Sequence, residues 1–397
     1  MTLFQSRPWR RLTFFVLVML MIEFLDEFAY SALEAARPLI RDAFALSYVE
    51  VGLITTIPVL VAIVVEPLIG LIADSGRRRS LMVWGAVLFG LGLIIQGVSP
   101  TFGVFMIGAT FQAPASGIFV NLAQASLMDD APTRRENRMA MWTFSGSLAV
   151  VIGPLLLSGL LLLGSGWRLF FIVSGLLSIV VAAVIARLAA NPAMRSTEED
   201  DDTIDIKASL REIWQLNSRW DIWRWLILLQ FSDLMLDVFF GLLALYMVDV
   251  VAVPQTQAAL AIAVWTGVGL IGDFLLIPIL ERVDGLAYLR VSAAVELVLL
   301  PLFLLASNWW LILLLLGLMG LFNAGWYAIL QGKVYDALGE KSGAVLIVGN
   351  LAGIFGALLP LGLGWAAQAF GLDSAIWFLL AGPIALVIGL PRQKVRE

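Results

Sequence analysis

The chain has 397 residues and a formal net charge of −5, and it is 60% hydrophobic but only 14% charged. A soluble globular protein holds about 45–50% apolar residues, so this composition excludes a soluble fold and predicts a membrane protein. Cysteine and histidine are both absent, which excludes disulfides, thiolate nucleophiles, Cys/His metal sites and His-dependent triads and leaves carboxylates for proton chemistry.

Twelve apolar segments follow one another along the chain. Each is close to the length of about 20 residues at which a helix spans a bilayer. The sequence therefore predicts an all-α polytopic membrane protein with twelve transmembrane helices. The segments cover residues 12–34, 48–70, 81–98, 102–127, 139–163, 167–189, 223–248, 257–280, 286–306, 309–334, 342–368 and 373–390.

Basic residues are distributed unevenly between the two sides of the predicted helices. If both termini are cytoplasmic, all of the 25 Lys and Arg residues except Arg37, Arg41 and Arg168 fall on the cytoplasmic side. Cytoplasmic loops carry the basic excess in membrane proteins, and miscounting one helix would invert the pattern. We therefore expect a multi-pass protein of a bacterial-type inner membrane with both termini in the cytoplasm.

A polar stretch at 190–222 divides the chain and is predicted to be a cytoplasmic linker. It contains an acidic run and tryptophans suited to the headgroup layer. We expect a six-helix bundle on each side, at 1–189 and 223–397. An offset of 207 residues pairs scarce polar residues of the two halves, as expected for a pseudo-symmetric repeat with a pathway between its bundles. The pairs are Asp26 with Asp233, Glu66 with Asp273, Asp74 with Glu281, and Gln124 with Gln331.

The first segment carries several acidic side chains at helical spacing. Glu23, Asp26 and Glu27 share one face, which cannot point at lipid. Asp233 and Asp237 lie one turn apart in the repeat-related segment. We interpret Asp26 and Asp233, supported by Glu23, Glu27 and Asp237, as a proton-coupling and substrate site, because crowded carboxylates in a shared cavity can hold and exchange protons near neutral pH.

A structural interpretation of these carboxylates remains open. Some of them can pair with Arg37 or accept hydrogen bonds from neighbouring helices. Glu34 is expected to matter least, because it lies near the outer surface, where water can reach it.

Other polar residues in the predicted spans could line the path or form gates. For the two acidic residues, Glu66 and Asp273, gate contacts and structural pairing are equally good interpretations. For the amide residues, interhelical hydrogen bonding is the commoner use. No lysine or arginine lies well away from the interfaces, which disfavours a multiply anionic substrate. The pathway candidates are Glu66, Asp273, Gln124, Gln331 and Asn350.

The loop after the second segment reads Gly70-Leu-Ile-Ala-Asp74-Ser-Gly76-Arg77-Arg78-Arg79. It resembles the signature G-x-L-x-D-[RK]-x-G-[RK]-[RK] of the major facilitator superfamily, with Ser75 and Arg77 departing from the pattern. The resemblance implies that Gly70, Asp74, Arg78 and Arg79 stabilise one conformation of the transporter. The second half keeps a weaker copy at 281–284.

Gly153 and Pro154, in the fifth segment, are similar to the Gly-Pro motif of antiporter members of that superfamily. Ala109 stands where drug–proton antiporters usually carry an arginine. Taken together, the resemblance covers nearly the whole chain. It implies two six-helix bundles and an efflux-type, drug–proton antiporter-like protein.

We predict a secondary active transporter, with proton-coupled efflux of a neutral or cationic organic solute as the first hypothesis. An uptake symporter or uniporter and a transporter-fold receptor or scaffold stay open as alternatives. An enzyme is not expected, because the sequence offers no His, no Cys and no G-x-S-x-G for a nucleophile and base. It also has no phosphate-binding loop, so ATP is not expected to be the direct energy source. The expected partners are a small molecule, protons and the bilayer, with no cofactor, metal or nucleic acid, and the protein is expected to be a monomer.

A G-x-G-x-x-G pattern at 267–272 lies inside an apolar segment with no strand before it. Small residues at such spacing let helices approach closely. The pattern therefore predicts helix packing rather than dinucleotide binding.

Overall fold

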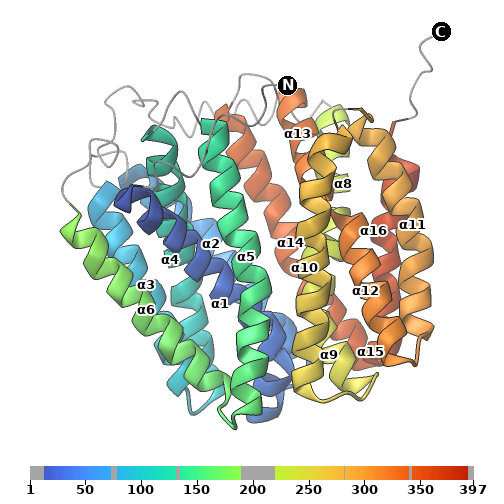
Figure 1. Ribbon diagram of the computed structural model, residues 1–397, viewed down its shortest axis with the longest axis horizontal. Coiled ribbons are helices and arrows are strands. Elements are labelled where there is room, and N and C mark those ends of the chain that lie inside the picture. Colours follow the sequence, from blue (N-terminus) through green and yellow to red (C-terminus); the bar gives the residue numbers. More distant parts are fainter. Residues whose placement is uncertain are drawn as a thin grey trace, which may run out of the picture. The chain divides into compact units, whose positions relative to one another are not determined.

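The computed structural model describes residues 13–72, 78–130, 135–188, 220–280, 282–338 and 342–391, and these ranges are helical with no strand. The first half forms six long helices (Figure 1). They coincide with the first six predicted segments, except that the first helix runs ten residues further. These helices are α1 (Phe14–Phe44), α2 (Tyr48–Ile72), α3 (Arg78–Val98), α4 (Phe102–Asp129), α5 (Arg135–Leu162) and α6 (Trp167–Arg187).

In the second half, three of the predicted helices are interrupted. The predicted segment 223–248 contains a π-helical turn, 309–334 contains a break, and 373–390 contains a 3-10 turn. The elements are α8 (Trp220–Asp233), the π-helical η5 (Leu234–Val238), α9 (Phe239–Asp249), α10 (Gln255–Leu280), α11 (Gly285–Leu305), α12 (Trp309–Asn323), α13 (Trp326–Leu338), α14 (Ser342–Phe370), α15 (Leu372–Ala375), the 3-10 helical η6 (Ile376–Leu380) and α16 (Ala381–Gly389).

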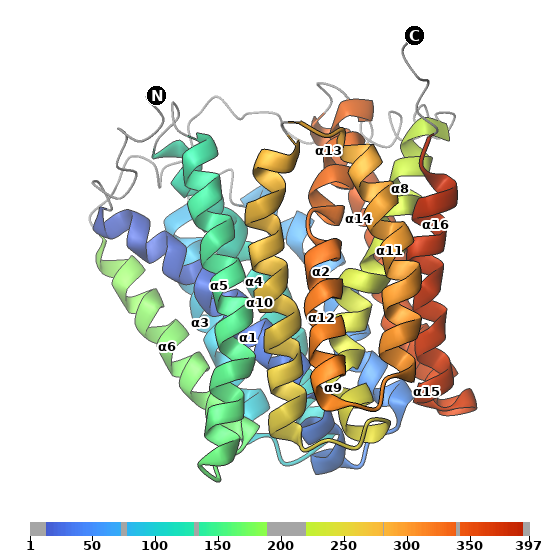
Figure 2. The same ribbon diagram turned by 45° about the vertical axis from the view of Figure 1, so that its right-hand side comes forward.

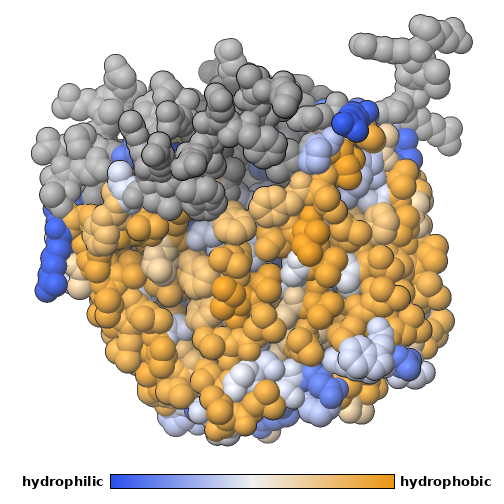
Figure 3. All heavy atoms as spheres, in the orientation of Figure 1, coloured by the Kyte–Doolittle hydropathy of each residue, from blue (hydrophilic) through white to orange (hydrophobic). Residues whose placement is uncertain are grey.

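Within the described residues, 11 helices are long and apolar enough to cross a membrane. The 31-residue α1 adds a further long helix, which is less apolar because of its acidic side chains. Large hydrophobic side chains are exposed along these helices, and Figure 3 shows a mainly hydrophobic face with hydrophilic residues near its edges. Such a surface is suited to lipid rather than to water, and the prediction of a multi-pass membrane protein is confirmed.

By its internal contacts the chain divides into two compact units, which are described separately below. The first unit comprises Met1–Ala29, Val64–Ala149 and Arg168–Asp201, and the second comprises Tyr30–Ile63, Val150–Trp167 and Asp202–Glu397. Helices α1, α2 and α5 therefore contribute to both units. The predicted domain boundaries at 189 and 223 were based on the polar linker in the sequence and not on contacts, and they stay a prediction.

In the first unit, α3 and α4 lie side by side at glycine contacts (Figure 1). A Cβ atom added to Gly92 would lie 2.7 Å from the carbonyl oxygen of Gly108, and one added to Gly108 would meet Gly92 at the same distance. Beside this contact, Gln96 donates to Gln112 at 2.5 Å. The two backbones approach this closely because neither glycine carries a side chain.

In the second unit, α10 packs against α12 through the predicted small-residue pattern. A Cβ atom added to Gly272 would lie 2.8 Å from that of Ala324, and one added to Gly269 would lie 3.4 Å from the Gly320 carbonyl oxygen. This contact confirms that the G-x-G-x-x-G pattern serves helix packing. On the other side of α12 lies α11, which also packs against α16 (Figures 1 and 2).

Candidate functional site

Acidic side chains of α1 and α2 lie within electrostatic reach of one another in the first unit. The carboxylates of Asp26 and Glu27 lie within electrostatic reach of Glu23, as expected from their shared helix face. Glu66 of α2 lies within reach of Asp26. Glu23 is only 8% exposed, and the other three side chains are partly buried. The structure thus brings a predicted pathway residue, Glu66, to the predicted coupling residues of α1.

Helix α4 provides a hydrogen-bond donor and space for this acidic cluster. The Ser116 hydroxyl donates to Oδ1 of Asp26 at 2.6 Å. The next residue, Gly117, faces Glu66, whose carboxylate occupies the position that a Cβ atom on Gly117 would take. Neither α4 residue is among those predicted from the sequence. The run of small residues at 113–117 was the signal that could have identified them.

Helix α5 makes space for Glu23 in the same way. A Cβ atom added to Gly146 would lie 2.7 Å from Oε1 of Glu23. One residue earlier, the Ser145 hydroxyl donates to the Leu20 carbonyl oxygen at 2.8 Å, which holds α5 against α1. The acidic face of α1 is therefore packed against small residues of α5 instead of lipid.

In the second unit, Asp233 and Asp237 lie at the π-helical turn η5. Asp233 ends α8, and it lies within electrostatic reach of Asp237. The Gln230 amide donates to Asp233 at 3.4 Å, and Gly356 of α14 leaves room for the Gln230 side chain, with an added Cβ atom 2.6 Å from Oε1. Single π-helical turns inside α-helices are frequent at functional sites. Gln230 is not among the residues predicted from the sequence.

Glu34 is buried, which corrects the expectation that water reaches it. Arg37 binds both Glu34 oxygens, at 2.5 and 2.6 Å, and donates to the Thr55 hydroxyl of α2 at 2.6 Å. Glu34 is 1% exposed and Arg37 is 4% exposed. A glycine of α9 explains the burial, since an added Cβ atom on Gly241 would lie 2.9 Å from a Glu34 oxygen. Asp237 lies within electrostatic reach of this ion pair.

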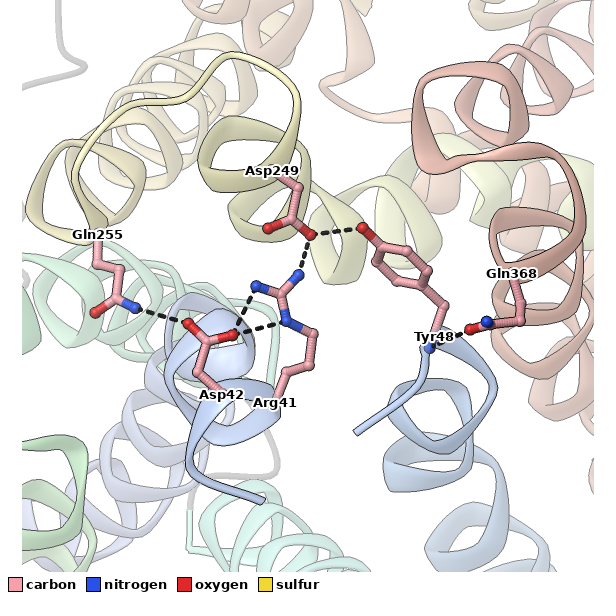
Figure 4. A network of polar contacts seen from close by, with 6 residues as sticks. All are labelled: Arg41, Asp42, Tyr48, Asp249, Gln255 and Gln368. Atoms are coloured by element: carbon pink, nitrogen blue, oxygen red, sulfur yellow. Dashed lines mark hydrogen bonds and ion pairs between the residues drawn. The ribbon is translucent and has the colours of Figure 1, made fainter. Parts of the chain in front are cut away.

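A set of polar contacts, here called the Arg41 network, connects the end of α1 and the start of α2 to α9, α10 and α14 (Figure 4). Arg41 binds both Asp249 and Asp42, and the Tyr48 hydroxyl donates to Asp249 at 2.7 Å. Gln255 donates to Asp42 at 3.5 Å, and the Tyr48 amide donates to Gln368 at 3.2 Å. All six side chains belong to the second unit. Figure 4 shows Arg41 at the centre, between the two aspartates.

The Arg41 network is not predicted by any sequence pattern. Arg41 was recognised only as one of the basic residues outside the cytoplasmic side. Its partner Asp249 lies 208 positions further along the chain, and no local pattern relates two residues at that separation.

The remaining pathway candidates lie in separate places. Asp273 of α10 accepts a hydrogen bond from the Gly325 amide at 3.2 Å, at the break between α12 and α13. Gln124 of α4 contacts the Met139 sulfur at 3.7 Å. Gln331 is partly buried on α13, and the side chain of Asn350 on α14 lies outside the described residues.

The pairing of Asp26 with Asp233 stays a prediction. Asp26 belongs to the first unit and Asp233 to the second. The same holds for the predicted pair of Glu66 and Asp273. Within the described chain, no group of three or more Asp and Glu residues is arranged to hold a metal ion.

Two arginines of the predicted loop signature make contacts in the first unit. Arg78 binds Asp129 of α4 at 2.6 Å, and Arg79 donates to the carbonyl oxygens of Ile185 and Ala186 in α6. They therefore hold the start of α3 to the ends of two other helices. Asp74 and Glu281, and the surroundings of Gly70 at the end of α2, lie outside the described residues. Gly153 and Pro154 are buried in α5.

The sequence matches the family model described as the Major Facilitator Superfamily over residues 19–357. Among curated proteins, the fosmidomycin resistance protein of Escherichia coli is 24% identical over 164 residues, which are 41% of this chain and 40% of that protein. The putative multidrug resistance protein MdtD of Escherichia fergusonii is 26% identical over 180 residues, 45% of this chain and 38% of that protein. The match thus spans less than half the length of each relative.

Two solved structures resemble nearly the entire fold. A bacterial homologue of the human lysosomal transporter Spinster, in an inward-facing and occupied conformation, has a TM-score of 0.73 at 17% identity and covers 97% of this chain and 95% of that one. The nucleoside transporter NupG has a TM-score of 0.75 at 12% identity and covers 95% and 98%. At these identities the likeness shows the fold alone.

Proposed function

The chain belongs to the Major Facilitator Superfamily, and from that premise we propose that it exports a neutral or cationic organic solute in exchange for protons. Its family and its relatives make it a multi-pass membrane transporter of a small molecule rather than an enzyme. Two of the relatives are named for resistance to fosmidomycin and to multiple drugs. Export is the direction of transport that confers resistance, which supports efflux for this chain.

The acidic cluster on α1 and α2 is the observation that carries proton coupling. Glu23, Asp26, Glu27 and Glu66 act on one another within one unit. Carboxylates that repel one another when ionised favour a shared proton, and an arriving cation can displace it. The chain has no histidine or cysteine that could take this role.

The only arginine buried deep in α1 supports a solute that is not anionic. Arg37 already binds both oxygens of Glu34 and the Thr55 hydroxyl. Its charge is therefore neutralised within the protein. The acidic groups at Asp233 and Asp237 favour a positively charged or neutral ligand in the second unit.

We infer an inner-membrane location with both termini in the cytoplasm, from the distribution of the basic residues. The Arg41 network then lies at the periplasmic end of α1, where it closes this end of the second unit. We also infer that one chain is sufficient for transport.

The decisive experiment measures solute flux in proteoliposomes with an imposed pH gradient, across a panel of cationic and neutral compounds. Asp26→Asn and Asp233→Asn remove one charge each and preserve the side-chain size. We expect each to reduce proton-driven flux about 5- to 150-fold, the range of a typical coupling free energy between two sites. Asp201→Asn, the same change in the predicted linker, is the matched control and should leave flux unchanged.

A structural role for these carboxylates predicts a different result. The variants would then melt at lower temperature, while the remaining flux would still depend on pH. Normally folded Asp26→Asn and Asp233→Asn proteins with full proton-driven flux would contradict the assignment. Solute accumulation in everted vesicles on acidification of their interior tests the export direction, because an uptake symporter would lose solute under that gradient.

A further inference from the structure

The break between α12 and α13 is held in place by polar side chains of two other helices. Asp273 of α10 accepts a hydrogen bond from the Gly325 amide at 3.2 Å, and the Tyr288 hydroxyl of α11 donates to the Ala324 carbonyl oxygen at 3.1 Å. Gly325 has a φ of 72°, a conformation that glycine adopts without strain. Non-helical backbone is tolerated at membrane depth only where the protein satisfies its polar groups. The break is therefore a built feature of the second unit.

One face of α11 presents polar groups toward this break. Tyr288, Ser292 and Glu296 follow one another at intervals of four residues, so they lie on the same face. Tyr288 contacts the break directly, and Ser292 accepts a hydrogen bond from the Trp326 indole at 2.8 Å. Glu296 lies one turn further along. It is 0% exposed, and neither of its oxygens has a hydrogen-bond partner among the described residues.

The charged groups near Glu296 do not supply a counter-ion. The neighbours α12, η6 and α16 contain no ionisable residue. In α13, which also packs against α11, Lys333 follows Trp326 by seven residues, about 10 Å along the helix. Helix α9 contacts the far end of α11, where the neutral Tyr246 hydroxyl donates to the Leu304 carbonyl oxygen. On α11 itself, Arg290 donates to the carbonyl oxygens of Leu390 and Pro391.

The remaining charged and titratable groups are acidic or neutral. Tyr288 lies within electrostatic reach of both Glu296 and Asp273. Helix α13 also contains Tyr327, Tyr335 and Asp336. None of these groups could neutralise an ionised Glu296.

An ionised carboxylate without donors in an apolar interior is strongly destabilising, and a bound proton removes that penalty. Asn323, the last residue of α12, offers a donor that is not used elsewhere: it is 5% exposed, and neither side-chain amide atom has a partner in the described chain. We propose that Glu296 is a proton-binding site, separate from the acidic groups of α1 and α8, and that release of its proton is coupled to a rearrangement of the α12/α13 break that brings the Asn323 amide to the carboxylate.

The proton passes between the Glu296 carboxyl group and water when the break rearranges, and no other group is consumed. Proton occupancy then shifts the population of two conformations of the break. This site does not depend on the direction of transport or on the solute, because a uniporter of the same fold could contain it.

The test uses the purified full-length chain, which contains no native cysteine. Ala328→Cys places an environment-sensitive thiol dye on an exposed position of α13, two residues after the helix begins. We expect the dye emission to change with pH in this background and the change to be lost on adding Glu296→Gln. Infrared difference spectra between two pH values should lose one carboxyl band in the same variant. Asp373→Asn, at an exposed carboxylate of α15, is the matched control and should retain both signals.

A Glu296→Gln protein that keeps the dye response and the full carboxyl signal would overturn the proposal. Glu296→Met provides a second variant in case the amide is poorly tolerated. A neutral carboxyl group among apolar side chains can be replaced by an apolar one of similar length at little cost, so this variant should melt at least as high as the parent and also lack the pH response. Lower melting temperatures in both variants would reveal a structural hydrogen bond at Glu296 and would equally overturn the proposal.

Discussion

At the residue scale, glycines decide where the carboxylates of the first unit can lie. Glu66 occupies the space beside Gly117, and Glu23 approaches Gly146. A flexible acidic side chain can move away from an added methyl group, whereas a backbone carbonyl cannot. Glycines that face carboxylates should therefore affect transport, and glycines that face backbone should affect stability.

We predict that Gly117→Ala displaces the Glu66 carboxylate and reduces transport with little change in melting temperature. Gly92→Ala places its methyl group 2.7 Å from the Gly108 carbonyl oxygen and should destabilise the protein by about 1–3 kcal/mol, as overpacking does. Gly103→Ala, in α4 like Gly117, has no atom within 4 Å of the added methyl group and serves as the control. Flux and melting temperature measured on all three separate the two effects. Unchanged flux in Gly117→Ala would show that the position of Glu66 does not matter for transport.

At the scale of elements, irregular turns and helix ends carry several of the polar contacts. Asp233 directly precedes the π-helical η5 and Asp237 lies within it, and the Arg41 network joins the end of α1 to the end of α9. Helix ends leave backbone groups without intrahelical partners, and charged side chains there can form or break contacts without disturbing the helix interior. The Arg41 network is therefore suited to a gate.

We predict that Asp249→Asn opens the end of the second unit that the Arg41 network closes. It weakens the hydrogen bond to the Arg41 charge, and such bonds contribute about 1.5–3 kcal/mol. Val51 is 2% exposed in α2, so Val51→Cys should react with a thiol reagent only when this end opens. Its labelling rate should rise about tenfold or more in the Asp249→Asn background.

Asp42→Asn is the matched control for this experiment, since it removes the other Arg41 partner. The Asp42 side chain is 52% exposed, and ion pairs of exposed groups contribute about 0–1 kcal/mol. Its labelling rate should therefore stay close to that of the parent. Equal rates in the two aspartate variants would rule out a special role for Asp249.

At the scale of the molecule, the distribution of basic residues determines the expected orientation. If the predicted spans alternate in direction, Arg41 and Arg168 fall on the periplasmic side, whereas Arg78, Arg79 and Arg187 fall on the cytoplasmic side. Positive charges stay on the cytoplasmic side during insertion. This orientation decides on which side of the membrane the proposed gate at the Arg41 network lies.

We predict that cysteines introduced at Ser6, Ser196 and Gln393 react with a membrane-impermeant thiol reagent only after the cells are permeabilised. Ala43→Cys, at the exposed end of α1, should react in intact cells. The cysteine-free parent provides the blank. Labelling of Ser196→Cys or Gln393→Cys from outside would mean that the helix count or the orientation is wrong.

Local sequence patterns were sufficient to predict the helices and to identify a membrane protein. The length and apolarity of each segment identified α1 to α6 and the spans of the second half, because helix formation in lipid depends on the segment itself. Helical spacing also identified the acidic face of α1, with Glu23, Asp26 and Glu27 within reach of one another.

Only the tertiary structure decided which of these side chains have partners. Glu34 was expected at a hydrated surface, yet Thr55 and Gly241 enclose its pair with Arg37. Glu296 received no role from the sequence because a single carboxylate in an apolar segment has no periodic signal, and its isolation became evident only once its neighbouring helices were in place. Burial and pairing depend on residues brought from distant parts of the chain, and helical periodicity contains no information about them.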